Sequence, residues 1–154
     1  MARIEVIHHA PGAPGLRWLG LGPGLMPRQG LKKLKLLLNK YAFWTASRSE
    51  TQVRRMLKGS KVVISIWRDN RLVGFGRATS DGIYRAVLWD VVVAGDLQGK
   101  GLGRQVVEAL LNARAIKEVE KVYLMTTNST NFYEQLGFEK SKQQNLLFRN
   151  KIKQ

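Results

Sequence analysis

The stretch AVLWDVVVAGDLQGKGLGRQVVEALLNA, residues 86–113, predicts a buried strand, a glycine-rich turn and an amphipathic helix in direct succession. Residues 89–93 are apolar or β-branched except for Asp90, which is typical of a strand that is covered on both faces. The apolar residues of the helix recur at spacings of three and four, namely Val106, Val107, Leu110 and Leu111. A strand that leads through glycines into a helix predicts an α/β unit at the centre of the fold.

The turn has the sequence Gln98-Gly99-Lys100-Gly101-Leu102-Gly103, with three glycines in six residues. Backbone N–H groups at the start of a helix, together with the positive end of its dipole, bind phosphate. Glycine suits this role because a Cβ would hold the anion away from the backbone. Lys100 and Arg104 add positive charge. The turn therefore predicts a phosphate site, and a simple tight turn between strand and helix is the alternative.

Two better-known phosphate motifs do not match this turn. The dinucleotide fingerprint requires its last two glycines three residues apart, whereas Gly101 and Gly103 are two residues apart. The P-loop requires Ser or Thr after Gly-Lys, whereas Gly101 follows Lys100. The sequence therefore favours a phosphate ligand of another class.

The composition limits the chemistry further. The chain has 154 residues and no cysteine, which excludes disulfides, thiolate metal sites and an acyl-enzyme route through sulfur. Its formal net charge of +15 suits nucleic acid, an anionic membrane or a polyanionic cofactor. The basic residues are scattered, which favours general solvation, and a basic nucleic-acid-binding module stays as the alternative of another class. Since no stretch resembles a transmembrane run or a signal peptide, we expect a soluble intracellular protein with no membrane partner.

The N-terminal part predicts a short strand over 3–9 and then a loop or mobile arm over 11–30, which holds all four prolines. The apolar residues of this arm are expected to pack on the body or on a partner, and they favour a homodimer: Trp18, Leu19, Leu21 and Leu25. His8 and His9 are adjacent but have no carboxylate or third ligand beside them, so no metal site is predicted.

The remaining periodicities predict alternating helices and strands. An amphipathic helix is expected over 31–41, and a second helix begins with a capping box from Ser49 to Gln52 and ends at Gly59. Further helices are expected over 101–113 and 128–136, and strands over 61–67, 71–79, 83–93, 121–126 and 138–152. The early strands should pair antiparallel, whereas 83–93 and 121–126 should be parallel because a helix connects them.

Two of these motifs resemble the signatures of one family. Gln98-x-x-Gly101-x-Gly103 after a hydrophobic strand is similar to the pyrophosphate-binding motif of the GCN5-related N-acetyltransferases (GNAT). The run Asn131-Phe132-Tyr133-Glu134-Gln135-Leu136-Gly137-Phe138 resembles their second signature, an aromatic-Tyr-x-x-Leu-Gly-Phe run. The resemblance implies a single GNAT domain over 1–154 with an α/β fold. In that fold antiparallel strands precede a β-α-β unit, and the central strand of the mixed sheet splays from its parallel neighbour.

The resemblance also implies acetyl-CoA as co-substrate, without a metal. The pantetheine arm would lie along the central strand, at Val91, Val92 and Val93. The pyrophosphate would lie on the turn formed by Gln98, Gly99, Lys100, Gly101, Leu102, Gly103 and Arg104. Tyr133 would give its hydroxyl proton to the leaving thiolate, which suits a phenol that is protonated at neutral pH. The family often has an asparagine seven residues before this tyrosine, but Thr126 stands there, so Asn128 is the candidate for its role.

Acetylation of an amine also requires a base, because an ammonium group cannot attack until it loses a proton. Asp90 is the candidate, since an unpaired carboxylate in an apolar strand is costly. It could act directly or through water, or it could hold the incoming ammonium. The alternative is that Asp90 is a buried partner for an arginine or for backbone donors.

A closer resemblance is to the plastid and cyanobacterial branch related to plant serotonin N-acetyltransferase, carried by Gly76-Arg77-Ala78-Thr79-Ser80-Asp81 and Leu88-Trp89-Asp90-Val91-Val92-Val93. It implies acetylation of an arylalkylamine such as serotonin or tryptamine, as in melatonin biosynthesis. The paired motifs and the absence of cysteine favour direct transfer in a ternary complex. The location would be a cyanobacterial cytosol or a plastid stroma. Protein lysines or N-termini are alternative acceptors. A cationic aromatic acceptor needs a carboxylate and an aromatic wall, for which the candidates are Asp81, Tyr84 and Trp89.

Overall fold

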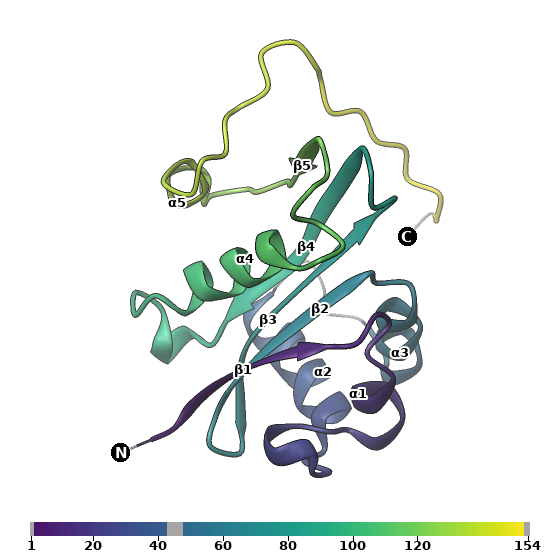
Figure 1. The fold of residues 1–154 in the computed structure, drawn as a ribbon, viewed down its shortest axis with the longest axis vertical. Coiled ribbons are helices and arrows are strands. Elements are labelled where there is room, and N and C mark those ends of the chain that lie inside the picture. Colours follow the sequence, from purple (N-terminus) through teal and green to yellow (C-terminus); the bar gives the residue numbers. More distant parts are fainter. Residues whose placement is uncertain (1, 43–47, 153–154) are drawn as a thin grey trace.

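The computed structural model describes residues 2–42 and 48–152. Its centre is a five-stranded sheet in the order β1-β2-β3-β4-β5 (Figure 1). The strands are β1 Ile4–His9, β2 Val62–Arg68, β3 Arg71–Ser80, β4 Arg85–Val93 and β5 Lys121–Tyr123. Neighbours from β1 to β4 pair antiparallel, and β4 pairs parallel with β5. The mixed sheet of the α/β class that the sequence predicts is confirmed.

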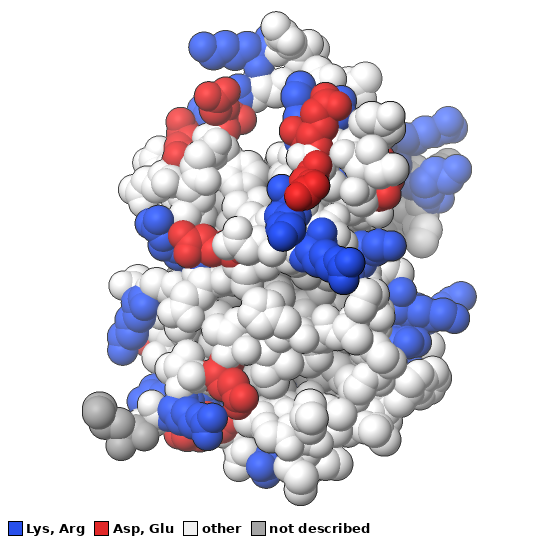
Figure 2. Space-filling model, in the orientation of Figure 1, with Lys and Arg blue, Asp and Glu red and all other residues white. Residues whose placement is uncertain are grey.

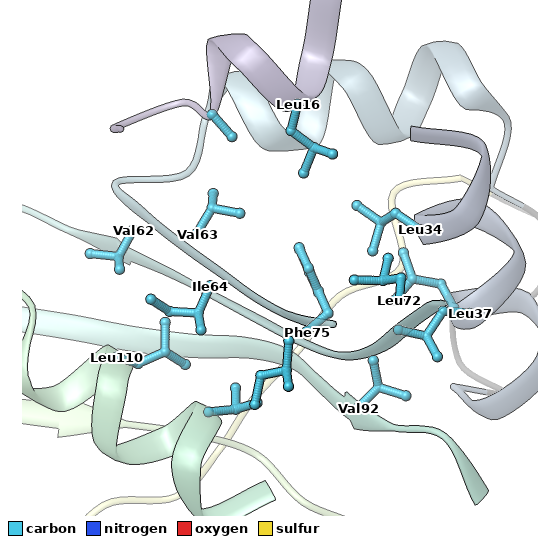
Figure 3. Close-up of a cluster of buried hydrophobic side chains, with 14 of the residues drawn as sticks. Leu16, Leu34, Leu37, Val62, Val63, Ile64, Leu72, Phe75, Val92 and Leu110 are labelled. Carbon is cyan, nitrogen blue, oxygen red and sulfur yellow. The ribbon is translucent and has the colours of Figure 1, made fainter. Parts of the chain in front are cut away.

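Helices cover both faces of the sheet. They are α1 Pro14–Leu19, α2 Gly30–Tyr41, α3 Glu50–Lys58, α4 Leu102–Asn112 and α5 Thr130–Glu134, with 3-10 turns η1 Pro23–Leu25 and η3 Gly95–Leu97. Helix α4 packs on one face, and α1, α2 and α3 pack on the other (Figure 1). Figure 3 shows Leu110 of α4 on one side of the strands and Leu16 and Leu34 on the other. None of the helices described is long and apolar enough to cross a membrane.

The two predicted helices before β2 are confirmed, with the local signals that the sequence carries. Leu31, Leu34 and Leu38 of α2 are buried, as their spacing predicts. Helix α3 begins with the capping box: the backbone N–H of Gln52 donates to Ser49 Oγ at 3.2 Å, and that of Ser49 donates to Gln52 Oε1 at 2.9 Å. Both helices therefore follow from local sequence.

The prediction of a loop or mobile arm over 11–30 is wrong for Pro14–Leu19, which form α1. Proline suits the first turn of a helix because no N–H is needed there, and Gly20 ends the helix in the left-handed region at φ 60. Leu16 is buried under this helix, whereas Trp18 and Leu25 are 68% and 79% exposed. Leu16 thus packs this segment against the core, while several of its other apolar side chains face solvent.

The predicted strand over 138–152 is also wrong. Residues 139–152 form no helix or strand, pair with none of the described strands, and are exposed. In Figure 1 this segment runs as a long arc past β5. Alternating apolar residues favour a strand, but a strand forms only where a neighbour satisfies its backbone groups, and the segment has none in this structure.

Candidate functional site

The parallel pair β4 and β5 separates where the chain approaches the glycine turn. β5 pairs only with Arg85, Ala86 and Val87, from Arg85↔Lys121 to Val87↔Tyr123. Beyond Val87, none of the described strands pairs with Val91, Val92 or Val93 on that side of β4. The edge of β4 that includes Val91, Val92 and Val93 is therefore open to an extended ligand, as expected for a splayed central strand.

The glycine turn leaves open space in front of the first turn of α4. Gly99 and Gly101 have φ values of +80 and +84, which an L side chain rarely adopts, and a Cβ on either would meet no atom within 4 Å. Gly101 is the N-cap of α4, and no side chain caps the helix there. The backbone N–H groups at the start of α4 are thus presented to solvent beside exposed Lys100, an arrangement that fits a phosphate.

Three other residues predicted to bind the cofactor already have roles within the protein. The side-chain amide of Gln98 donates to the carbonyl oxygen of Val93 at 3.2 Å, which ties the turn to the end of β4. Arg104 donates from Nε to Glu108 one helical turn later, at 2.8 Å. The side chain of Leu102 is buried in the core, so only its backbone can face a ligand.

Tyr133 lies on α5 close to the turn. A Cβ on Gly103 would stand 3.3 Å from the ring of Phe132, so α5 packs directly against the start of α4. The Tyr133 ring packs edge-on against Phe132 at 4.9 Å and against Phe138 at 5.8 Å between centroids. Burial raises the pKa of the Tyr133 hydroxyl, so the phenol stays protonated at neutral pH.

A cavity of about 550 Å³ brings Tyr133 together with the splayed strands. Its walls include Val87 and Trp89 of β4 and Tyr123 and Met125 at and after β5. Trp89 also donates from Nε1 to Thr79 Oγ1 at 2.8 Å, which fixes its ring. Of the predicted acceptor-binding residues, Trp89 is therefore the one that shares a cavity with Tyr133.

Asp90 lies in a β-bulge. Phe75 pairs with Val92 and Arg77 with Trp89, so one residue of β3 faces two of β4, and Asp90 has φ 55. Sequence reasoning could not locate this bulge, because aspartate is tolerated both in strands with a partner and in the left-handed region.

The Asp90 carboxylate is buried between two arginines. Its Oδ2 accepts from Arg48 at 2.9 Å and from Arg77 Nε at 2.8 Å, and the side chain is 3% exposed. Burial alone would raise the pKa of this carboxyl, but the hydrogen bonds from both arginines outweigh it and hold the pKa below its usual value. Arg77 also stacks over the Trp89 ring at 5.8 Å. These contacts match the alternative of a buried arginine partner for Asp90, and no local pattern identifies Arg48 and Arg77 as the residues that supply it.

Asp81 and Tyr84, the other two predicted acceptor contacts, lie in the turn before β4. Asp81 Oδ1 accepts from the backbone N–H groups of Ile83, Tyr84 and Arg85, at 2.8, 2.7 and 3.2 Å, and the first of these is the main reason why its pKa is lowered. Tyr84 is 60% exposed. This turn is at the opposite end of β4 from the glycine turn, so the structure does not bring Asp81, Tyr84 and Trp89 into one site.

Asn128 is exposed just before α5, in the loop that follows β5. Its Oδ1 accepts from the Ser129 hydroxyl at 3.3 Å, while the backbone N–H of Ser129 donates to Thr126 Oγ1 at 3.1 Å. Thr126 lines the Tyr133 cavity. Both polar residues therefore precede α5, and of the two it is Thr126 that lines the cavity of Tyr133.

His9 is half-buried and joins a hydrogen-bond network on the sheet. Its Nε2 lies 2.7 Å from Ser65 Oγ, which also accepts from Trp67 Nε1 at 3.0 Å. Burial lowers the pKa of His9 to about 4, so the ring is neutral at physiological pH. The described residues contain no group of three side chains that could hold a metal ion.

Residues 59–140 match a family model described as acetyltransferase (GNAT) domain. The chain is 40% identical over 94 residues to uncharacterized N-acetyltransferase ycf52 of Porphyra purpurea, which covers 58% of this chain and 54% of that protein. It is 40% identical over 99 residues to chloroplastic serotonin N-acetyltransferase 2 of Oryza sativa subsp. japonica, which covers 59% and 48%. It is 32% identical over 114 residues to histone acetyltransferase TAP1 of Glycine max, which covers 73% and 46%. The chain spans about half the length of these curated relatives.

Solved structures share the fold. An acetyltransferase of the GNAT family from Streptococcus pneumoniae TIGR4 superposes with a TM-score of 0.70 at 18% identity, covering 97% of this chain and all of that one, 100%. At this identity the likeness concerns the arrangement of helices and strands.

Proposed function

Because this chain belongs to the GNAT family of acetyltransferases, we propose that it transfers the acetyl group of acetyl-CoA directly to a primary amine. The observation that carries the proposal is the open glycine turn at the start of α4, next to the unpartnered edge of β4 and the cavity of Tyr133. A diphosphate, an extended amide chain and a thioester follow one another in acetyl-CoA in that order.

The residues present fit acetyl-CoA. The N–H groups at the start of α4 would bind the pyrophosphate, with Gly99 and Gly101 allowing its close approach and Lys100 adding charge. The pantetheine arm would lie along Val91, Val92 and Val93 and hydrogen-bond their backbone as an added strand does. The side-chain amide of Gln98 already donates to the carbonyl oxygen of Val93, where β4 ends. An amide N–H of the pantetheine arm would therefore either share this acceptor with Gln98 or replace Gln98 there.

In the proposed reaction the amine nitrogen forms a bond to the thioester carbonyl carbon, and the carbon–sulfur bond then breaks. The leaving sulfur would take the proton of the Tyr133 hydroxyl. Burial raises the pKa of the Tyr133 hydroxyl, so the phenol is protonated at neutral pH and holds the proton that the leaving sulfur would take. The absence of cysteine supports direct transfer, since no thiol is available to carry the acetyl group between substrates.

For Asp90 we favour the role of positioning residue over that of base. A carboxylate held by Arg48 and Arg77 with a lowered pKa is a poor proton acceptor, and its charge is offset by two guanidinium groups. Arg77 in turn stacks on Trp89, which lines the cavity. Asp90 would therefore hold the aromatic wall in place, while the proton of the amine leaves through water.

The acceptor we propose is an arylalkylamine such as serotonin or tryptamine. The support is the aromatic wall formed by Trp89, Tyr123 and Tyr133 in the cavity, together with the likeness to the serotonin N-acetyltransferase of Oryza sativa. Aromatic faces suit an indole ring through stacking and a nearby ammonium through its positive charge.

The experiment is to mix the purified protein with acetyl-CoA and serotonin, tryptamine, tyramine, polyamines or lysine peptides, and to follow the free thiol. We expect thiol release with the aromatic amines and intersecting initial-rate plots, as direct transfer requires. Parallel plots would contradict direct transfer. If calorimetry detects no binding of acetyl-CoA, the proposed function fails as a whole.

Acetylation of protein lysines is the second candidate, favoured by the 32% identity to histone acetyltransferase TAP1 of Glycine max. The same assay separates the two candidates. Faster thiol release with lysine peptides than with tryptamine would replace the arylalkylamine as acceptor and leave acetyl transfer intact.

A further inference from the structure

Helix α1 and the turn η1 present large apolar side chains to solvent at the end of the molecule away from β5 (Figure 1). Four of these side chains are at least half exposed: Trp18 68%, Leu19 63%, Leu25 79% and Met26 52%. In Figure 2 the surface over α1 and η1 is mostly white, so few charged side chains interrupt it there. An exposed apolar area of this kind marks a surface that binds a partner.

Two arginines fix the exposed ring of Trp18. The guanidinium carbons of Arg17 and Arg54 lie over this ring, 5.5 and 5.6 Å from its centroid. Arg17 Nε donates to the carbonyl oxygen of Gly12 at 2.8 Å, and Arg54 Nε donates to that of Arg17 at 3.2 Å. Both cations are therefore anchored to the backbone beside an exposed aromatic ring. Tryptophan next to cationic side chains is typical of the interface between a membrane and water.

The part of the chain that forms α1, α2 and α3 carries more than half of the net positive charge. Residues 14–58 hold ten lysines and arginines and one acidic residue, Glu50. On α2 the exposed residues Lys32, Leu36 and Lys40 follow one another at intervals of one helical turn, and Leu36 is 56% exposed. A face that combines leucines, a tryptophan and an excess of cations is complementary to an apolar layer under anionic headgroups.

We propose that the face formed by α1, η1 and α2 binds the surface of an anionic lipid bilayer, with Trp18, Leu19 and Leu25 inserted among the headgroups. A second copy of the chain is disfavoured here, because a twofold dimer would bring the same cations face to face. A nucleic acid is disfavoured because it offers no apolar layer to the leucines, and because guanidinium groups already lie over the Trp18 ring where a base would stack.

The proposed membrane face lies on the other side of the sheet from the glycine turn. Helices α1, α2 and α3 cover one face, whereas the turn at Gly101 begins α4 on the opposite face. Acetyl-CoA and a bilayer can therefore bind at the same time, and the proposal does not depend on acetyl transfer. The sequence predicts no membrane partner because it has no transmembrane run, but binding to a bilayer surface requires none.

The test is flotation of the full chain with vesicles of phosphatidylcholine alone, or of phosphatidylcholine and phosphatidylglycerol in equal parts. We expect the protein to float with the anionic vesicles and not with the neutral ones, whether or not acetyl-CoA is present. Leu19→Ser/Leu25→Ser should lower the partition coefficient about 10-fold, because it removes exposed apolar area. Lys32→Glu should also lower it about 10-fold, because it reverses an exposed charge that would face the lipid phosphates.

Two matched controls lie outside the proposed face. Ile83→Ser removes a side chain that is 64% exposed in the turn before β4, and Lys117→Glu reverses an exposed charge that follows α4. Both should float as the unmodified protein does, and every variant should keep its circular dichroism spectrum because each replaced side chain is exposed.

Equal losses in the control and test variants would show attraction by net charge alone and would overturn the proposal. Flotation that acetyl-CoA abolishes would overturn it too, since the lipid headgroups would then occupy the glycine turn. The same holds if the protein floats with neither kind of vesicle, as a monomer or as a dimer, or if a DNA duplex displaces the anionic vesicles.

Discussion

At the scale of single residues, Tyr133 makes the sharpest prediction. Replacing it by phenylalanine removes the hydroxyl proton and keeps the ring that packs between Phe132 and Phe138. We expect kcat to fall about 100-fold, the scale of a lost general acid, while the Kd for acetyl-CoA from calorimetry stays the same. An equal loss in both quantities would show that Tyr133 binds the cofactor and does not donate a proton.

Asp90→Asn tests whether the carboxylate is a base or a partner for arginines. The change leaves Arg48 and Arg77 without their buried counter-charge, so we expect the free energy of unfolding to fall by about 3 kcal/mol. The pH dependence of kcat should keep its shape in the folded variant. Loss of an ionisation from the pH–rate profile would instead identify Asp90 as the base.

His9 makes the fold sensitive to acid. Burial lowers its pKa from 6.5 to about 4, so on acidification the unfolded chain takes up the proton first and stability is lost as the pH falls from 6.5 towards 4. Between pH 7.5 and pH 4.5 this one group should contribute a loss of about 2.5 kcal/mol. Urea unfolding at the two pH values should show a smaller loss for His9→Gln. His8→Gln serves as the comparison: it should keep most of the acid sensitivity, because burial is the main cause of the lowered His9 pKa and the charge of His8 is the smaller one.

At the scale of elements, the glycine turn offers a prediction with a control in the same chain. Gly101→Ala and Gly82→Ala both place a Cβ at a positive φ, +84 and +79, with no atom within 4 Å. Both should therefore lose stability by a similar amount, about 1 kcal/mol. Only Gly101 faces the proposed pyrophosphate, so only Gly101→Ala should weaken acetyl-CoA binding, about 10-fold by calorimetry. Equal weakening in both variants would mean that the turn acts through stability alone.

Local signals decided which elements could be predicted from the sequence. The leucine spacing of α2, the Ser49–Gln52 capping box of α3 and the parallel β4–β5 pair were all predictable, because each depends on residues close in the chain or on a simple rule of connection. Helix α1 was missed because glycines and prolines surround a helix of only six residues. The strand over 138–152 was expected from alternation alone, which does not tell whether a neighbouring strand is in reach.

The residues of the candidate site also differ in whether neighbouring sequence is enough to predict them. The turn and Tyr133 can be proposed from the sequence because the residues of each motif are consecutive in the chain. The partners of Asp90 are not predictable in this way, since Arg48, which precedes α3, and Arg77, which lies in β3, are 42 and 13 residues away in the chain. Asp81 shows a related ambiguity: an acidic residue before a turn can be a ligand or an acceptor for the turn's own N–H groups, and in the structure Asp81 accepts from those groups.

At the scale of the whole molecule, the net charge of +15 should act on the rate of cofactor capture. Figure 2 shows lysines and arginines spread over the visible face with acidic residues among them, and no continuous stripe such as a duplex would require. Stopped-flow fluorescence should give an association rate for CoA that falls about 5-fold between 50 and 500 mM salt. Dephospho-CoA, which carries less charge, should show a shallower dependence. Association rates that do not change with salt concentration for either ligand would contradict electrostatic capture.

The bulge at Asp90 also determines which residues of β4 face the helices on each side of the sheet. Before the bulge Trp89 shares a face with Arg77, whereas after it Val91 reaches the α4 side, where a Cβ on Gly76 would stand 3.5 Å from it. Because peptide groups alternate in direction along a strand, the same offset decides which N–H and C=O groups of Val91, Val92 and Val93 point to the open edge. Removing one residue there would reverse the direction of these N–H and C=O groups and would turn Val91 away from α4. The extra residue of the bulge, Asp90, therefore sets both the packing of β4 against the helices and the hydrogen-bonding groups at its open edge.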